Sequence, residues 1–425
     1  MDMTQRPVAK SAKMQASDKT LRYDQARTDV YVSQLTLSHF RNYPSLRLSL
    51  TGGKKTNEAS SAGPVILFGP NGSGKTNLLE ALSLLAPGRG LRRAARDDLL
   101  CQSFAAPPSH LAAADMSSSA SVSISPPVWA VSATIVTAMG PVQLSTGLQP
   151  DKPEGARHYY LDGIKATSAH LAEQCALSWL TPQMDGLFIG SPSSRRRFID
   201  RLVIAFDPAH SARLSRYEKL YRERQKLIQT GADDSWFRSL EIQLAENGVA
   251  VMAARTALVR VMSEDAYQGD RAFGFPRIHM AMRGGGCEWL DHHPALEVED
   301  RICADAAVRR QNGDLTMLGP QAQDLVTIHL DKGQPAHLAS TGEQKALLIA
   351  AILAHARLQD TRLSRPPLLL LDDVAAHLDE RKRGCLFAAI SELTAQVWYS
   401  GTDEATFAPL KDFGQFLHVQ NGQIS

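Results

Sequence analysis

The spacing of hydrophobic residues divides the chain into two α/β regions with a helical region between them. In the first region, apolar and polar residues alternate with the period of half-buried strands. These predicted strands lie at residues 30–40, 46–50, 128–136, 142–144 and 158–163. The break Arg41-Asn42-Tyr43-Pro44 separates the first two strands, so we expect a hairpin there. Residues 51–63, rich in Gly, Ser and Lys, are expected to form an exposed loop.

From about residue 205 to 265 the apolar residues recur at intervals of three and four, which predicts amphipathic helices. One helix covers 214–228, a turn follows at 231–235, and a second helix returns from Trp236 to about Met262. The region is therefore a helical hairpin, too short for a long coiled-coil arm. The three glycines 284–286 mark another turn.

The last third returns to an α/β pattern. Residues 368–371 are four leucines, which is typical of a strand buried on both faces of a parallel sheet. The other predicted elements are helices at 343–358 and 381–393, a strand at 396–400, and a hairpin at 416–424 with its turn at Asn421-Gly422. This order predicts an α/β protein with an inserted, mainly helical second lobe.

Composition limits the class of protein. The chain has 425 residues, 44% hydrophobic and 21% charged, and its net charge of +2 means that any affinity for nucleic acid must come from local patches. No apolar run is as long as a membrane span. The five cysteines are dispersed and contain no C-x-x-C pair, which argues against a disulfide framework and a zinc site. We expect a cytoplasmic protein.

Two segments fall outside this pattern. Residues 1–28 mix basic and acidic residues without an apolar core, so we expect a disordered tail rather than a targeting signal. Residues 103–127 are rich in Ala, Ser and Pro, and we interpret them as a low-complexity insertion in a loop. The expected divisions are thus a first part at 29–204, a helical lobe at 205–315 and a last part at 316–425.

A glycine-rich loop follows the apolar residues 64–68 and precedes the helically spaced residues 77–85. It consists of Gly69, Pro70, Asn71, Gly72, Ser73, Gly74, Lys75 and Thr76. Strand, loop and helix in this order predict a phosphate-binding loop, with backbone N–H groups around the phosphates, Lys75 on the β- and γ-phosphates and Thr76 on Mg²⁺. The alternative is a glycine-rich turn before an ordinary helix. We favour binding of ATP or GTP.

Three further segments are candidate parts of the same site. Asp372 and Asp373 end the leucine strand; alone they could mark a core strand meeting solvent, but beside a phosphate loop they predict a metal ligand and a group that activates water. Ser340-Thr-Gly-Glu343 reads as a helix capping box, and the same Ser hydroxyl and Gly342 amide can bind a γ-phosphate. Gln183 lies between the β region and the helical insertion.

The order phosphate loop, glutamine, helical insertion, Ser340 segment, Asp372-Asp373 and Asp379 resembles an ABC-type P-loop ATPase head. The short insertion is similar to that of the branch used in chromosome maintenance and DNA repair, and within it the chain resembles the RecF family over about residues 30–425. The segments that carry this resemblance are Leu37-Ser-His-Phe-Arg-Asn-Tyr43, Gly69 to Thr76, Pro182-Gln183, Gly190 with 195–200, Gly319-Pro320 with Asp324-Leu325, Ser340 to Lys345 and Leu370 to Asp373.

The resemblance implies ATP and Mg²⁺ as ligands, with Thr76, Gln183 and Asp372 on the metal. It implies catalytic roles for Asp373, Gln183 and Asp372. The nucleotide contacts outside the loop that it implies are Arg41, Asn42, Ser340, Gly342, Glu343 and Asp379. Since the Ser340 segment cannot reach the phosphate loop of its own chain in such heads, it also implies an ATP-dependent, head-to-tail homodimer.

What the resemblance implies about function is a clamp on double-stranded or gapped DNA, in recombinational repair after DNA damage and at replication forks. It further implies RecR and RecO as partners in loading the recombinase, and a weak, DNA-stimulated ATPase. The chain departs from the pattern at Asp373, where Glu is common, so we expect slow hydrolysis that depends on DNA. Gln321 stands where relatives commonly have His, and Gly401-Thr402-Asp403 leaves the γ-phosphate sensor open.

Residues 191–228 contain ten Arg and Lys against four acidic residues, a local excess of +6 (10 minus 4) that suits DNA phosphates. The candidate DNA contacts are Arg195, Arg196, Arg197, Arg201, Arg216 and Lys219. The alternative is a solvated helix face with pairs such as Glu218 and Arg222.

At the level of function, the alternatives are the ATPase subunit of an ABC transporter, which would not need this basic hairpin, and a nuclease-linked relative, for which no further metal cluster is visible.

Overall fold

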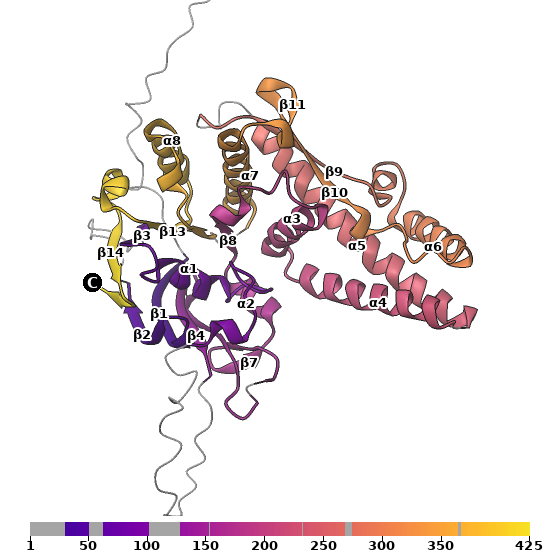
Figure 1. Cartoon of the computed structure of the whole chain (residues 1–425), viewed down its shortest axis with the longest axis horizontal. Coiled ribbons are helices and arrows are strands. Elements are labelled where there is room, and N and C mark those ends of the chain that lie inside the picture. The colour runs from indigo at the N-terminus through magenta and orange to yellow at the C-terminus, as the bar shows by residue number, and fades with distance from the viewer. Residues whose placement is uncertain are drawn as a thin grey trace, which may run out of the picture.

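The computed structural model describes residues 30–50, 63–101, 128–152, 154–231, 233–267, 274–363 and 367–425. The predicted tail at 1–28, most of the loop at 51–63 and the insertion at 103–127 lie outside these ranges. Within them the chain forms two six-stranded sheets and one three-stranded sheet, with helices between and beside them (Figure 1).

The first sheet contains the predicted β-rich region in the strand order β2-β1-β4-β5-β6-β7, and every neighbouring pair is antiparallel. Its strands are β1 (Tyr31–Phe40), β2 (Tyr43–Ser49), β4 (Ala130–Thr137), β5 (Gly140–Gly147), β6 (His158–Leu161) and β7 (Ile164–Ala166). The pairing of β1 with β2 confirms the predicted hairpin, with Phe40 opposite Tyr43 across the turn.

The second sheet has the order β15-β14-β3-β13-β12-β8, and all of its strands except β15 run parallel to their neighbours. Its strands are β3 (Val65–Phe68), β8 (Leu177–Leu180), β12 (Leu368–Leu371), β13 (Gln396–Gly401), β14 (Gln415–Gln420) and β15 (Gln423–Ile424). The leucine strand is central and fully buried, as predicted. Hydrophobic spacing did not predict β8.

Alternate leucines of β12 point into two different cores. Leu368 and Leu370 belong to the core that contains α1 (Lys75–Ser83) and the first sheet. Leu369 and Leu371 belong to the core on the opposite face, which contains α7 (Thr341–Arg362) and α8 (Glu380–Ser391). This two-sided burial explains why the strand carries no polar position.

The second core continues without a break into the helical lobe, which projects from the sheets in Figure 1. The remaining helices are α2 (Ser168–Gln174), α3 (Pro192–Phe206), α4 (His210–Thr230), α5 (Asp234–Tyr267) and α6 (Ala295–Gln311). Helix α3 begins before the predicted start of the helical region at residue 205. Hydrophobic spacing missed α6, because only Val298, Ile302 and Ala306 of that helix are buried.

The lobe also contains a small sheet that was not predicted. Its strands are β9 (Ile278–Arg283), β10 (Asp324–His329) and β11 (Gln334–Pro335), in the order β11-β10-β9. The antiparallel pairing of β9 with β10 joins residues on both sides of the expected boundary at 315. Short 3-10 helices connect the elements, at Asp97–Leu99, Pro182–Met184, Cys287–Asp291, Pro320–Ala322, Leu330–Lys332, Ala336–Leu338, Ala375–His377 and Glu404–Leu410.

Buried polar contacts join α3, α4 and α5. Asp200 accepts a bidentate pair from Arg255 at 2.7 and 2.8 Å and lies 2.8 Å from Nε2 of His210. Arg255 also donates to the carbonyl of Pro320 at 2.7 Å, which ties the Gly319-Pro320 loop to the lobe.

All five cysteines are free, as expected. Within the described ranges, no helix combines the length and apolarity of a membrane crossing.

Candidate nucleotide-binding site

The loop between β3 and α1 has the backbone shape that its glycines allow. Gly69 and Gly74 have φ of 144° and 116°, which disfavour any residue with a side chain. A Cβ on Gly74 would lie 2.5 Å from both Nδ2 of Asn42 and the hydroxyl of Tyr43, and a Cβ on Gly69 would lie 2.2 Å from the carbonyl oxygen of Val419. The loop is thus pressed between the first hairpin and β14, and glycine is required at both positions.

Lys75 lies at the wall of a cavity of about 250 Å³. Its ammonium donates to the carbonyl oxygens of Gly69 and Pro70, each at 2.8 Å. Burial lowers the pKa of Lys75, whereas the nearby carboxylates of Asp373 and Asp372 raise it. The cavity is lined by Asn71, Gly72, Gly74, Lys75, Thr76, Asn77, Arg92, Asp373 and Ser400.

Asp372 contacts the phosphate loop directly. The Thr76 hydroxyl donates to its Oδ1 at 2.9 Å, and the Ser400 hydroxyl donates to the same oxygen at 2.7 Å. Only 6% of Asp372 is exposed, and this burial raises its pKa although both hydrogen bonds oppose the shift. A carboxylate beside a threonine hydroxyl forms the oxygen donor set that Mg²⁺ prefers, so these two residues fit the metal that the sequence predicts.

Asp373 has an unusual backbone and a free carboxylate oxygen. Its φ is 56°, in the left-handed region, and its N–H donates to Ser400 Oγ at 2.9 Å. Among the described residues, its buried Oδ1 has no hydrogen-bond partner. Because buried carboxylate oxygens are rarely left unpaired, this oxygen is available to a ligand or a water molecule in the cavity.

Gln183 follows β8, whose Leu180 is paired with Leu371 in parallel register. The amide of Asp372 donates to the carbonyl of Leu180 at 2.9 Å, so Gln183 and the two aspartates leave the sheet at the same edge. The side chain of Gln183 is exposed, and it does not line the cavity. Its role at the metal stays a prediction.

Arg41 and Asn42 support the loop from behind, and neither lines the cavity. Arg41 makes a bidentate pair with Glu80 at 2.8 and 2.9 Å. Asn42 donates to the Ser73 carbonyl at 3.2 Å and accepts from Asn77 at 2.7 Å. The structure therefore gives these side chains a positioning role, and their predicted contact with the nucleotide stays a prediction.

Three cavity residues were not among the predicted site residues, namely Asn77, which directly follows the phosphate loop, Arg92 and Ser400. Arg92 donates to Asn77 at 2.7 Å and lies 3.6 Å from Glu80, which is fully buried between Arg92 and Arg41. Ser400 contacts both aspartates from the end of β13. Neither Arg92 nor Ser400 belongs to a motif with fixed spacing. The sequence features that could have indicated them are the Arg92-Arg93 pair after Gly90 and the polar end of the 396–400 strand.

The Ser340 segment forms the predicted capping box at the start of α7. The Ser340 N–H donates to the Glu343 carboxylate at 2.9 Å. Hydrogen bonds from Lys332, the larger cause, and from Ser340 lower the pKa of Glu343 to about 2. Gly342 is exposed, and a Cβ there would contact nothing within 4 Å, so packing within this chain does not require glycine. None of these residues lines the cavity of its own chain.

Two other sequence candidates have structural partners. Asp379 is exposed and caps α8 by accepting from the Lys382 N–H at 2.7 Å. Gln321 donates to the Met317 carbonyl at 2.6 Å and accepts from the Tyr217 hydroxyl, so it belongs to the lobe. Thr402 is exposed immediately after β13.

Some of the candidate DNA contacts are engaged by other parts of the protein, and the others have exposed side chains. Arg195 makes a bidentate pair with Asp324, both bonds at 2.7 Å, and Arg196 donates to the Gln323 carbonyl at 2.9 Å. Arg201 stacks on Trp179 at 4.4 Å from the ring centroid, and burial lowers its pKa to about 9. The guanidinium of Arg201 is thus engaged by Trp179 in this structure, and its predicted contact with DNA stays a prediction. The candidates with exposed side chains are Arg197, Arg216 and Lys219.

Comparisons with known proteins show the family of this chain. The family model described as RecF/RecN/SMC N terminal domain matches residues 31–425. A protein named DNA replication and repair protein RecF from Mesorhizobium japonicum is 39% identical over 399 residues, covering 93% of this chain and 97% of the relative. This chain belongs to the RecF family. The RecF of Brucella suis is also 39% identical, over 93% of this chain and 96% of its own length.

Solved structures of the family have the same fold. A structure titled as the recombination mediator protein RecF with ATPrS in the RecFOR pathway superposes with a TM-score of 0.73 at 17% identity, covering 94% of this chain and 99% of that chain. A second one, titled RecF-ATP, superposes with a TM-score of 0.72 at 16% identity. The predicted fold, an ABC-type P-loop ATPase head with an inserted second lobe, is therefore confirmed.

Proposed function

We propose that this chain is an ATP-dependent DNA-binding protein of replication and recombinational repair, in which ATP closes two copies of the chain head to tail on double-stranded or gapped DNA. The observation that carries this proposal is the contact between Thr76 and Asp372, because it joins the phosphate loop to the two strand-end carboxylates. Membership of the RecF family, whose members are named for DNA replication and repair, supports the same function.

ATP would occupy the cavity at Lys75, and a bound Mg²⁺ would supply charge neutralisation at the phosphates. Thr76 and Asp372 would hold the metal, with Gln183 reaching it from the same sheet edge. Lys75 would exchange its carbonyl contacts for phosphate oxygens, while Arg92 adds a second cation to the cavity wall. A solved relative is titled RecF-ATP, which supports the choice of ATP over GTP.

The homodimer is proposed from the exposed start of α7. Ser340 and Gly342 present a hydroxyl and a helix N-terminus to solvent, away from the cavity of their own chain. A γ-phosphate in the cavity of a second copy would bind these groups, and its loss on hydrolysis would release them. Asp373 would activate the attacking water slowly, since its carboxylate is one methylene shorter than the common Glu.

DNA would be bound on the closed dimer through exposed basic residues, of which Arg197, Arg216 and Lys219 are the candidates. No base-reading element is involved in this proposal, so binding should depend on DNA shape and salt rather than on sequence. RecR- and RecO-type mediators are the proposed protein partners, because solved relatives are assigned to the RecFOR pathway in their titles.

The test compares DNA binding by the wild-type chain and Lys75→Met, with and without ATP. We expect ATP to tighten binding of gapped DNA by the wild type and to leave Lys75→Met unchanged. The matched control is Lys165→Met, which removes an exposed lysine on β7 and should behave as the wild type does. DNA binding that needs no ATP and tolerates the Lys75 substitution would overturn the clamp.

A further inference from the structure

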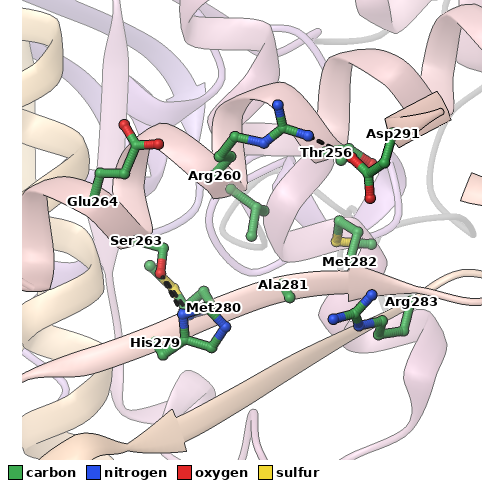
Figure 2. Close-up of a pocket in the computed structure, with 11 residues that line it drawn as sticks. Thr256, Arg260, Ser263, Glu264, His279, Met280, Ala281, Met282, Arg283 and Asp291 are labelled. Atoms are coloured by element: carbon green, nitrogen blue, oxygen red, sulfur yellow. Dashed lines mark hydrogen bonds and ion pairs between the residues drawn. The ribbon is translucent and has the colours of Figure 1, made fainter. Parts of the chain in front are cut away.

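A groove in the helical lobe lies between α5 and β9 and is separate from the nucleotide cavity (Figure 2). It encloses about 460 Å³. Its floor is lined by the apolar side chains of Val259, Met280 and Met282, which are at most 4% exposed. Nothing in the proposed ATP cycle uses this groove.

The groove exposes the free edge of a strand. In the described part of the chain, β9 pairs with β10 on one side and with no strand on the other. The Met280 N–H donates to the Ser263 hydroxyl of α5 at 3.0 Å, so the backbone groups of Met280 point away from β10. Outward groups alternate along an antiparallel strand, so the N–H and C=O of Met282 point the same way.

In the described part of the chain no strand lies on that side of β9, so strand pairing leaves these Met282 groups unpaired. Thr256 of α5 lies two helical turns before Ser263, about 10 Å along the helix axis, and therefore somewhat beyond Met282, which lies about 7 Å along the strand from Met280. The Thr256 Oγ1 is buried and has no partner among the described side chains. Figure 2 shows Thr256 above the Met282 end of the strand and Ser263 above the His279 end. Ser263 thus satisfies one end of the edge, and the other end is open.

The rim of the groove carries two acidic and two basic side chains, and one acidic and one basic side chain lie at opposite ends of the groove. Glu264 lies at the His279 end and Arg283 at the opposite end of β9 (Figure 2). Between them, Arg260 donates to Asp291 at 2.6 Å. Two carboxylates beside two guanidinium groups give no net positive field, which disfavours the DNA backbone as the occupant. An open strand edge above an apolar floor is the feature that extended peptides recognise.

We propose that this groove binds an extended segment of a mediator protein, which adds to the free edge of β9 as a fourth strand of the small sheet. The segment makes backbone hydrogen bonds to Met282 and places an apolar side chain on the floor. A cationic residue of the segment faces Glu264, and an acidic one faces Arg283. The identity of the partner rests on the proposed function, whereas the site rests on the geometry of α5 and β9.

The first experiment measures binding of purified RecR- and RecO-type mediators, encoded in the same genome, to the immobilised full chain. Thr256→Arg fills the open end of the groove and should weaken binding of one mediator by about tenfold or more, the loss of one well-placed interface contact. Ala257→Arg adds the same side chain at the next, exposed position of α5 and should leave the affinity unchanged.

The second experiment uses the wild-type chain alone and with mediator, so it decides even where Thr256→Arg fails to fold. Hydrogen exchange of the Met282 amide should slow in the complex, while amides of β10 that already pair with β9 change little. Unaltered exchange at Met282, equal affinity of Thr256→Arg and wild type, or no mediator binding at all would each overturn the proposal.

ATP-dependent DNA binding by Thr256→Arg separates this inference from the proposed function. We expect it to equal that of the wild type, because the groove lies outside the nucleotide site. A loss of DNA binding with mediator binding intact would make the groove a nucleic-acid surface and refute the peptide site. Failure of the clamp itself would appear in Lys75→Met, independently of the groove.

Discussion

The phosphate loop and helix α3 both concentrate positive charge, and they use it differently. Lys75 donates to carbonyl oxygens, so its charge remains available to the cavity that it lines. On α3, Arg195 is neutralised by Asp324, and Arg201 is packed against Trp179. The difference teaches that a count of basic residues along a helix does not separate charges that meet a ligand from charges that hold the fold.

Asp372→Asn gives the largest expected effect in the nucleotide site. The amide can still accept the hydrogen bonds from Thr76 and Ser400, so the fold should persist, but the negative charge for Mg²⁺ is lost. We expect ATP hydrolysis in the presence of DNA to fall by about 100-fold or more. Phosphate release measures it, and the exposed Asp412→Asn is the control. Near-normal turnover would remove Asp372 from the metal site.

Glu80→Gln tests whether the hairpin behind the loop depends on one buried charge. Glu80 is fully buried between Arg41 and Arg92, and its neutralisation leaves two cations without their partner. We expect a loss of about 3 kcal/mol in the free energy of unfolding, and weaker ATP binding because Arg92 loses its anchor. Urea unfolding and nucleotide titration measure the two effects. The exposed Glu392→Gln should change neither; unfolding unchanged in Glu80→Gln would contradict the ion-pair argument.

The free energy of unfolding should depend on pH through His355, which lies where α7 meets β8 and α3. This residue is fully buried, near the Ser178 hydroxyl and the Leu202 carbonyl, and burial lowers its pKa to about 4. Between about pH 6.5 and pH 4 the unfolded chain binds the proton and the folded chain does not, so stability falls as pH falls. His355 should therefore contribute a loss of about 1 kcal/mol between pH 7.5 and 5.5.

Urea unfolding of the wild type and of His355→Gln at the two pH values measures this contribution. The variant is expected to be less stable at pH 7.5 but to lack the His355 part of the pH dependence. An equal decrease of stability with acidity in both proteins would assign the effect to other groups.

Arg197→Ala and Arg201→Met give the smallest effects and sharpen the comparison on α3. Arg197 is exposed and bonded to Ser194 at 3.1 Å, so its loss should weaken DNA binding a few-fold and reduce the slope of log affinity against log salt by about 0.9. Arg201→Met should leave that slope unchanged, because the guanidinium of Arg201 stacks on Trp179. DNA titrations at several salt concentrations measure both. Equal slopes for Arg197→Ala and wild type would exclude Arg197 as a phosphate contact.

Much of the fold and of the site could be predicted from the sequence, because the responsible signals are local. Alternation in residues 30–50 predicted a hairpin, and the leucine run predicted the buried parallel strand. The glycine spacing of the phosphate loop reflects backbone angles that other residues rarely adopt. Strand β8 was missed because it has four residues and is buried at every position, and helix α6 because only three of its residues are buried. Strand β9 does alternate between buried and less buried positions, but over six residues only, which is a weak signal in the sequence.

The sequence by itself determined the phosphate loop, the capping box at Ser340 and the order of the motifs, since each depends on a few adjacent residues. Only the tertiary structure decided which charges are available. It paired Arg41 with Glu80, buried Arg201 against Trp179, and brought Arg92 and Ser400 into the cavity. Among the residues that the structure describes, it also left the edge of β9 without a neighbouring strand beside α5. The physical reason is that a charge or a backbone group acquires its role from the partner that folding brings to it, and that partner can lie anywhere in the chain.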